Sequence, residues 1–463
     1  MGLTPMQDQP QHFPGSRKWQ ASHAFFQKVF MVIALTLFSL VSTTVFATGT
    51  SSGYIIYIDA GSSGTRLHLY RYESTGTQTP QIEEIPVDSN ESSTTLASFY
   101  KHPLEAGNQL IKPLLDHAKA KLDELNKADP KHPISNVPVY LLGTAGMRLM
   151  QDRNAANVIY AVAKQYVLDN YKGTFFAVAT VPNTHDNNFD DLNGDKEALF
   201  GWLEVNYLLG NFAGDTQTAA VRKSTVGSID FGGASLEIAF EVPNLNTVAS
   251  EALKIGGQQY YVYVQSFSDL GQSKTREEIK NIANAETCFP QGYTTKNEDK
   301  TKTIKGNFSS FANANSFDAC QSVCNSLLGK KEHDEELKQI PSGLKGAMTF
   351  YGHSGINKTY NFFQVTSDPG IDGTAANQYH GTKESMKSRV EGICSKDMSK
   401  ADAGEIDDAG YFCPLGVFIH YFIYEKLSLN SSQLIVTNLI NGKKIGWTLG
   451  AVLNGLIFHN NPP

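Results

Sequence analysis

The chain has 463 residues, of which 41% are hydrophobic and 18% charged, a balance typical of a globular protein longer than one ordinary domain. Its formal net charge of −7 disfavours nucleic acid as a partner, because phosphate backbones select basic surfaces. An anionic substrate would therefore need local help from a metal ion and from backbone N–H groups.

The N-terminal segment, residues 1–47, is predicted to be a signal peptide. Basic residues precede an apolar run over residues 29–41, and Val45 and Ala47 are small residues of the kind that a signal peptidase reads. The run is short for a membrane span, and an uncleaved signal anchor is the alternative. We expect an exported protein, periplasmic or secreted, with no stable membrane span after cleavage.

Residues 54–70 predict a β-hairpin around a small turn. Residues 55–58 form one apolar run, and Leu67 and Leu69 alternate with polar residues in the second strand. The turn between them is built of glycine and serine, which let backbone N–H groups approach an anion. Asp59 ends the first strand beside this turn, where a carboxylate suits a hydrated divalent cation.

The same pattern returns at residues 227–240. Ile229-Asp230-Phe231-Gly232 aligns with Ile58-Asp59-Ala60-Gly61, and the same alignment sets Glu237 against Arg66. Two such turns suggest two related lobes that present phosphate-binding turns to one cleft. Glu237 either faces the reaction site, on the strand face that it shares with Ser235, or forms a salt bridge with Arg66 across the cleft.

Three other stretches carry candidate chemistry. Residues 137–142 predict a buried strand that runs into the small-residue turn over residues 143–148, which is either an anion or metal-water site or a tight junction. Glu197 opens a helix after an acidic loop and is either a general base or a favourable helix-terminal charge. Trp447, at the turn into the last helix, either faces the site or packs in the core.

Five cysteines fit an exported protein, since disulfides persist outside the cytosol. No second cysteine pair or histidine completes a zinc set with Cys320 and Cys324. The preferred pairing is Cys288 with Cys320 and Cys394 with Cys413, which leaves Cys324 free.

Taken together, these motifs resemble those of the apyrases, the nucleoside triphosphate diphosphohydrolase family within the actin-like ATPase superfamily, and indicate an exported bacterial member. The matching stretches, in chain order, are Asp59-Ala60-Gly61-Ser62-Ser63-Gly64-Thr65, Gly143-Thr144-Ala145-Gly146-Met147-Arg148, Glu197 with Gly201-Trp202 and Asn206-Tyr207-Leu208-Leu209-Gly210, Asp230-Phe231-Gly232-Gly233-Ala234-Ser235, and Gly446-Trp447-Thr448-Leu449-Gly450. The family's aromatic run is matched only by Phe350-Tyr351. Glu237 stands where the family usually carries glutamine.

The resemblance implies an α/β fold of two actin-like, ribonuclease H-like lobes with a central cleft. Lobe one would comprise residues 48–193 plus 439–463, and lobe two residues 194–438. A monomer is expected.

The resemblance also implies roles for individual residues. Asp59 and Asp230 would hold, through waters, one Mg²⁺ or Ca²⁺ ion. Glu197 would take a proton from an attacking water that Ser235 orients. The expected substrate-binding residues are Ser62, Ser63, Gly64, Thr65, Arg66, Thr144, Gly232, Gly233, Ala234, Glu237, Tyr351 and Trp447, with Tyr351 either stacking on the base or packing in the core.

The implied activity is hydrolysis of nucleoside tri- and diphosphates with release of the terminal phosphate. This chemistry needs positioning and charge neutralisation more than covalent catalysis. Two other functions fit the same fold: an exopolyphosphatase, and a non-enzymatic actin-like module that binds nucleotide.

Overall fold

A computed structural model describes residues 51–75, 78–128, 137–171, 176–177, 188–212, 223–243, 250–309, 316–341, 348–365 and 382–460. The expected signal peptide lies outside the described residues. Within the part of the chain that the structure describes, no helix has both the length and the apolar character needed to cross a membrane.

The first sheet contains both strands of the predicted N-terminal hairpin at its centre. In its described part the strand order is β3-β2-β1-β5-β6, with β4 paired to β2 and β7 to β5. β1 runs antiparallel to β2 and parallel to β5. The strands are β1 (Ser51–Gly61), β2 (Gly64–Ser74), β3 (Gln81–Ile85), β4 (Glu91–Ser92), β5 (Val137–Gly143), β6 (Phe176–Ala177) and β7 (Phe189–Asp191).

The second sheet is built around the second predicted hairpin, β8–β9. Its order in the described residues is β10-β11-β9-β8-β14-β15, and β8 runs parallel to β14. Its strands are β8 (Gly227–Phe231), β9 (Ser235–Glu241), β10 (Ser250–Ile255), β11 (Gln258–Ser268), β14 (Phe350–Ser354) and β15 (Leu434–Val436). Two short hairpins are β12 (Thr294–Lys296) with β13 (Thr303–Lys305), and β16 (Leu439–Ile440) with β17 (Lys443–Lys444).

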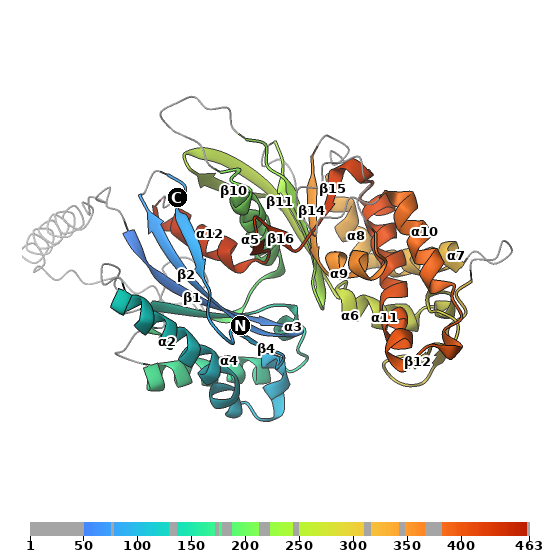
Figure 1. Cartoon of the computed structure of the whole chain (residues 1–463), viewed down its shortest axis with the longest axis horizontal. Coiled ribbons are helices and arrows are strands. Elements are labelled where there is room, and N and C mark those ends of the chain that lie inside the picture. Colours follow the sequence, from blue (N-terminus) through green and yellow to red (C-terminus); the bar gives the residue numbers. More distant parts are fainter. Residues whose placement is uncertain are drawn as a thin grey trace, which may run out of the picture. The chain divides into compact units, whose positions relative to one another are not determined.

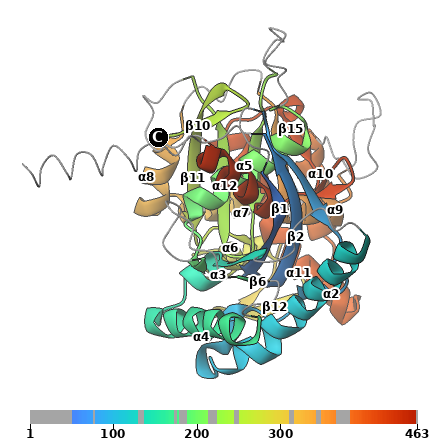
Figure 2. The same ribbon diagram turned by 90° about the vertical axis from the view of Figure 1, so that its left-hand side faces the viewer.

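The helices cover these sheets and separate them (Figures 1 and 2). They are α2 (Lys112–Ala128), α3 (Ala145–Arg148), α4 (Arg153–Tyr171), α5 (Gly194–Leu208), α6 (Gln272–Asn281), α7 (Ser316–Leu328), α8 (Lys331–Gln339), α9 (Gly355–Phe362), α10 (Lys383–Cys394), α11 (Ala403–His420) and α12 (Thr448–Asn460). A π-helical segment, Gly107–Ile111, leads into α2, and another, Tyr421–Lys426, extends α11.

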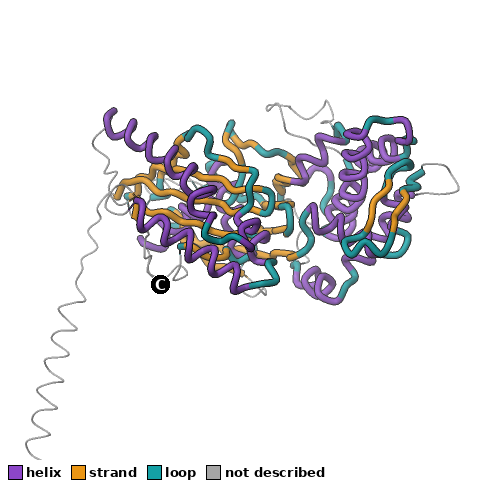
Figure 3. Tube along the Cα trace, turned by 90° about the horizontal axis from the view of Figure 1, so that it is seen from below, coloured by secondary structure: helices purple, strands orange, loops and turns teal. Residues whose placement is uncertain are grey.

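Three clusters of buried hydrophobic side chains form the core of the described residues. One lies between the first sheet and helices α2 and α4. A second joins the second sheet to α6, α7 and α9–α11, the helix-rich part that Figure 3 shows in purple beside the strands. The third contains side chains of α5, of α12 and of both sheets, so these two helices fill the space between the sheets. Helix α12 contacts α5 and also β1, β2 and β3.

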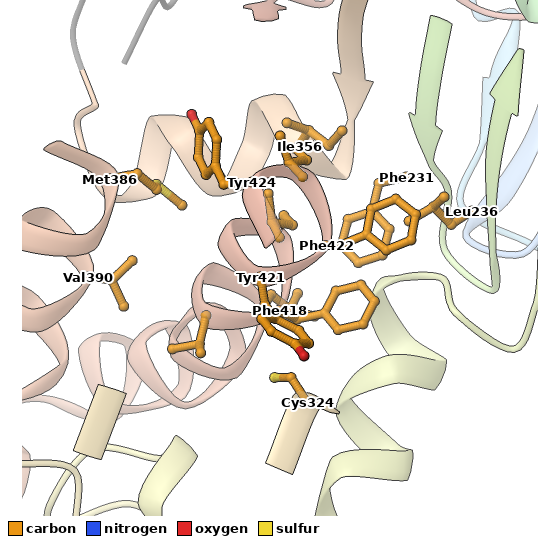
Figure 4. Close-up of a cluster of buried hydrophobic side chains, with 14 of the residues drawn as sticks. Phe231, Leu236, Cys324, Ile356, Met386, Val390, Phe418, Tyr421, Phe422 and Tyr424 are labelled. Atoms are coloured by element: carbon orange, nitrogen blue, oxygen red, sulfur yellow. The ribbon is translucent and has the colours of Figure 1, made fainter. Parts of the chain in front are cut away.

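The second cluster supports the turn after β8. Phe231 precedes that turn and Leu236 follows it, and Figure 4 shows both against the rings of α11 and its extension. The rings of Phe231 and Phe418 stack with centroids 5.8 Å apart. Burial of large aromatic rings is a strong source of stability, so this packing fixes the turn.

Both predicted disulfides are confirmed. Cys288 is bonded to Cys320, and Cys394 to Cys413, which ties α10 to α11. Cys324 is free and buried, and burial raises the pKa of its thiol well above the ordinary value. A thiol held in its neutral form is poorly reactive.

Candidate active site

The two glycine-rich turns have the same construction. In the first hairpin Asp59 lies opposite Arg66, and in the second Asp230 lies opposite Glu237. The correspondence predicted from the sequence repeat is therefore present in the strand registers. Each turn follows a buried strand, so its backbone is held at the end of a sheet.

A cleft of about 370 Å³ is lined by residues from both turns and from α5 and the turn before α12. The predicted site residues among its lining are Asp59, Ser62, Ser63, Arg66, Thr144, Glu197, Asp230, Gly232, Gly233 and Trp447. The structure thus brings together residues that are far apart in the sequence.

Two predicted contacts of the first turn do not line the cleft. A Cβ on Gly64 would lie 2.5 Å from the backbone oxygen of Ser92, and the φ of Gly64 is +153°. Thr65 is fully buried and donates from Oγ1 to the Thr94 oxygen at 2.9 Å. Gly64 and Thr65 thus pack against β4 and its neighbours, and their contact with substrate stays a prediction.

The predicted residue Ala234 lies elsewhere. It lines a separate cavity of about 360 Å³, together with Ser62, Ser63 and Gly233 of the two turns. Of the remaining predicted residues, Ser235, Glu237 and Tyr351 do not line the cleft itself.

Glu197 lies in the first turn of α5, as predicted. The side chain of Asn193 caps this helix by accepting from the N–H groups of Asp195 and Lys196. Glu197 is 8% exposed and its Oε2 accepts from Nη1 of Arg148 at 2.6 Å. Burial raises the pKa of its carboxyl to about 7, against the lowering effect of Arg148. A carboxyl that titrates near neutral pH is suited to accept a proton.

Arg148 connects Glu197 to the second hairpin. Its Nη2 lies 3.7 Å from Oε1 of Glu237 and 3.4 Å from Oγ of Ser235. Nη1 also donates to the backbone oxygen of Leu192 at 2.7 Å. This guanidinium therefore bridges two buried carboxyls and the predicted water-orienting serine.

The expected Arg66–Glu237 salt bridge is not formed. Arg66 lies 3.9 Å from Asp59 and 3.7 Å from Glu91, both near its own strand. Glu237 faces Arg148 and accepts from Oγ of Ser266 at 3.0 Å. Burial raises the pKa of Glu237 well above its ordinary value, and the neighbouring Glu197 and Asp230 raise it further.

Asp59 and Asp230 face the cleft from the two turns. The Oδ1 atom of each is buried and has no hydrogen-bond partner. Burial raises the pKa of Asp59, while His68 and Arg66 lower it. Asp230 Oδ1 lies 3.7 Å from Nδ1 of the buried His353. Among the described residues no group of three or more histidine, cysteine or acidic side chains is arranged to hold a metal ion directly.

Comparisons with known proteins decide the class. Residues 45–461 match the model of the GDA1/CD39 (nucleoside phosphatase) family. The chain belongs to this family. It is 26% identical to the nucleoside-diphosphatase mig-23 of Caenorhabditis elegans, over 90% of the chain and 79% of that protein. It is 24% identical to ectonucleoside triphosphate diphosphohydrolase 2 of Mus musculus, over 87% of the chain and 82% of that protein.

A shorter match is closer in sequence, and a structural match extends over nearly the whole chain. The Golgi apyrase of Schizosaccharomyces pombe is 36% identical over 41% of the chain, but the match spans only 32% of that protein. The crystal structure of nucleoside triphosphate hydrolases from Neospora caninum superposes with a TM-score of 0.57 at 16% identity, covering 94% of this chain and 97% of that one. The predicted α/β fold class is confirmed, and the chain is a hydrolase of the GDA1/CD39 family that acts on phosphoanhydrides.

In this GDA1/CD39 chain the turn before α12 lies at the cleft and is bonded to α5 through Glu204. Trp447 is 5% exposed and lines the cleft together with Asp59. Its ring lies edge-on to Tyr57, with centroids 6.3 Å apart. The structure thus gives Trp447 both of the positions that the sequence left open, since it packs in a core cluster and also reaches the cleft.

Tyr351 packs in the core. It is 7% exposed on β14, belongs to the cluster between the sheets, and does not line the cleft. These contacts favour the packing role of the two that the sequence left open, and stacking on a nucleotide base stays a prediction. The short aromatic match in this region is explained by core packing.

Sequence reasoning missed three residues that shape the site: Arg148, Glu204 and His353. Arg148 ends a motif that had been singled out, and its charge beside small residues was an available signal. Glu204 lies seven residues after Glu197 on a helix, which places both on one face. His353 pairs with Asp230 through the parallel register of β14 and β8, which no local pattern reveals.

Proposed function

We propose that this chain is an exported hydrolase of nucleoside tri- and diphosphates that releases the terminal phosphate. The observation that carries the proposal is the Glu197 carboxyl, which lines a cleft between two glycine-rich turns and has a pKa of about 7. The substrates are those in the names of the relatives, and backbone N–H groups at such turns suit their phosphates.

The proposed step is attack of a water oxygen on the terminal phosphorus. The bond from phosphorus to the bridging oxygen breaks, and its electron pair stays on that oxygen, which departs with the nucleoside di- or monophosphate. The proton of the water goes to Glu197, and Ser235 orients that water from the start of β9. Ser62, Ser63, Gly232 and Gly233 hold the phosphates, with Thr144 and Trp447 beside them.

A divalent cation, Mg²⁺ or Ca²⁺, fits between the turns. Asp59 and Asp230 would hold it through waters, since each presents a buried oxygen without a hydrogen-bond partner. Two carboxylates without a third direct ligand suit a hydrated ion. When bound, the cation neutralises charge that develops on the phosphate oxygens.

Export remains part of the proposal, because residues 1–47 lie outside the described residues. The two disulfides support it, since such bonds persist in oxidising compartments. The lobe boundaries and the monomeric state remain predictions from the sequence.

Removing divalent cations should abolish phosphate release. The acidic cleft carries Asp59, Asp230 and Glu197 and would repel a polyphosphate without a counterion. Release of phosphate from ATP is measured in excess EDTA and again after Mg²⁺ or Ca²⁺ is restored. Undiminished phosphate release in EDTA would contradict the proposed role of the divalent cation.

Replacing Glu237 by glutamine should keep activity and broaden or shift the pH profile of kcat. Glu197 and Glu237 are neighbouring buried carboxyls that titrate as a pair, so removing one ionisable group changes the pH range over which the other loses its proton. Profiles of kcat from pH 5 to pH 9 are compared for the two proteins, with melting curves to check folding. An unchanged pH profile would show that the charge of Glu237 does not affect the pH dependence of kcat.

A panel of substrates tests the function itself. Phosphate release is measured with ATP, ADP, GTP, GDP and long-chain polyphosphate at equal metal concentration. The proposal expects turnover of both tri- and diphosphates at typical enzyme rates, about 1 per second or more. Hydrolysis of polyphosphate alone would favour an exopolyphosphatase, and binding without turnover would favour a structural nucleotide-binding module.

A further inference from the structure

We propose that Glu204 is a positioning residue that fixes Trp447 against Asp59 and so links the helix of the general base to the carboxylates of the cleft. This inference rests on the proposed function. Glu204 is 3% exposed and lines the same cleft. Its two carboxyl oxygens accept from the backbone on either side of Trp447: Oε1 from Gly446 N–H at 2.7 Å and Oε2 from Leu449 N–H at 3.0 Å.

The position of Glu204 on α5 explains how it reaches this turn. Seven residues separate it from Glu197, close to two helical turns, so both carboxyls point from one face of α5. Helix α12 packs so closely on α5 that a Cβ on Gly450 would clash with the backbone oxygen of Phe200. With the helices this close, a glutamate on α5 spans the gap to the first N–H groups of α12, which have no partner within the helix.

The two hydrogen bonds leave the turn little freedom. Trp447 lies between the two bonded residues, and Oγ1 of Thr448 is 2.6 Å from the hydroxyl of Tyr70 on β2. The Trp447 ring packs edge-on against Tyr57, which itself stacks on Tyr140 with centroids 4.7 Å apart. Glu204 thus fixes the backbone of the turn, and the aromatic rings fix the indole that lines the cleft with Asp59.

The buried carboxyl of Glu204 lowers the stability of the fold when it is ionised. Burial raises the pKa of its carboxyl to about 7, while the N–H bonds and His68 lower it and Glu84 raises it. Because the folded pKa lies above that of the unfolded chain, the ionised form destabilises the fold as pH rises from about 4.5 to 7. A buried carboxyl with this cost is consistent with a role in placing the turn.

A double-mutant cycle tests whether Glu204 acts through Trp447. Glu204→Gln and Trp447→Phe are made singly and together, and kcat and KM for ATP are measured for all four proteins. Glutamine presents one acceptor oxygen and turns its NH₂ toward the other N–H. We expect Glu204→Gln to lower kcat by about tenfold, the size expected from losing one charge-assisted hydrogen bond. In the Trp447→Phe background the same change should lower kcat by less than about twofold.

A second readout does not depend on turnover. The tryptophans of the chain are Trp19, Trp202 and Trp447. Subtracting the emission of each Trp447→Phe protein from that of its parent isolates the Trp447 signal, which should shift between wild type and Glu204→Gln. Glu241→Gln is the matched control, because Glu241 accepts from Thr225 at 2.7 Å outside the cleft, and it should leave kcat and the emission unchanged.

The outcomes separate this inference from the proposed function. An equal loss of kcat in both backgrounds, or a Trp447 emission unchanged by Glu204→Gln, would overturn the link. If wild type hydrolyses no nucleotide, the proposed function fails, and the emission measurement still tests the contact. Should Glu204→Gln fail to fold, Glu204→Asp, whose shorter side chain keeps the charge but not the reach, takes its place with the same expectations.

Discussion

Replacing Glu197 by glutamine should lower kcat by about 10²–10⁴, the usual contribution of a general base. Glutamine keeps the size of the side chain and a hydrogen-bond acceptor for Arg148, so the cleft and nucleotide binding should survive. The amide has no basic oxygen for the proton of the attacking water. Single-turnover phosphate release measures the chemical step, and calorimetric titration with a non-hydrolysable nucleotide measures binding.

The control is a neighbouring carboxylate on the same helix turn. Asp195 accepts from the backbone N–H of Ser266 at 2.9 Å and does not line the cleft, so Asp195→Asn should retain near-normal kcat. Near-normal turnover of Glu197→Gln would show that Glu197 is only a helix-terminal charge.

Replacing Arg148 by methionine should have the second large effect, on both stability and catalysis. Removing one partner of a buried ion pair leaves an uncompensated charge and costs about 3–5 kcal/mol of unfolding free energy. Arg148 lowers the pKa of both Glu197 and Glu237. Its loss raises both pKa values, so the base is protonated at neutral pH and the acidic limb of the kcat profile moves to higher pH.

Melting curves and kcat measured from pH 6 to pH 10 test this expectation. The variant Arg148→Met with Glu237→Gln should recover part of the lost stability, because only one carboxyl then lacks its cation. Arg71→Met is the control, since Arg71 pairs with the exposed Glu83 at 2.7 Å and an exposed pair contributes about 0–1 kcal/mol. An acidic limb that does not move in Arg148→Met would show that the guanidinium does not set the protonation of Glu197.

The features predicted from the sequence are those that local pattern determines. Alternating apolar residues define the two hairpins, and the glycine-containing turns fix the registers that set Asp59 opposite Arg66 and Asp230 opposite Glu237. The helix expected to open at Glu197 is present as α5, which begins three residues earlier, at Gly194, behind a cap by Asn193 that the sequence analysis did not use. These signals lie within a few residues of each other, so one sequence suffices to read them.

The features that were missed depend on how distant segments meet. Arg148 and Glu197 are 49 positions apart in the sequence but hydrogen-bonded in the fold, and Glu204 reaches Gly446 only because α12 packs on α5. Tyr351 carries an aromatic ring of the kind that stacks on nucleotide bases, but side chains of the neighbouring helices and strands enclose this ring. Arg66 and Glu237 occupy matching places in two related hairpins, yet each has a nearer partner that the repeat does not reveal.

Product analysis in ¹⁸O-labelled water tests the central claim most directly. ATP and ADP are incubated in separate reactions with the full chain and a divalent cation. The masses of the phosphate and nucleotide products are then measured by mass spectrometry. Water attack on the terminal phosphorus predicts ADP and then AMP without label, and one labelled oxygen in each released phosphate, with both signals lost in Glu197→Gln. Release of pyrophosphate from ATP, label in the nucleotide, or no turnover of ADP would contradict the account.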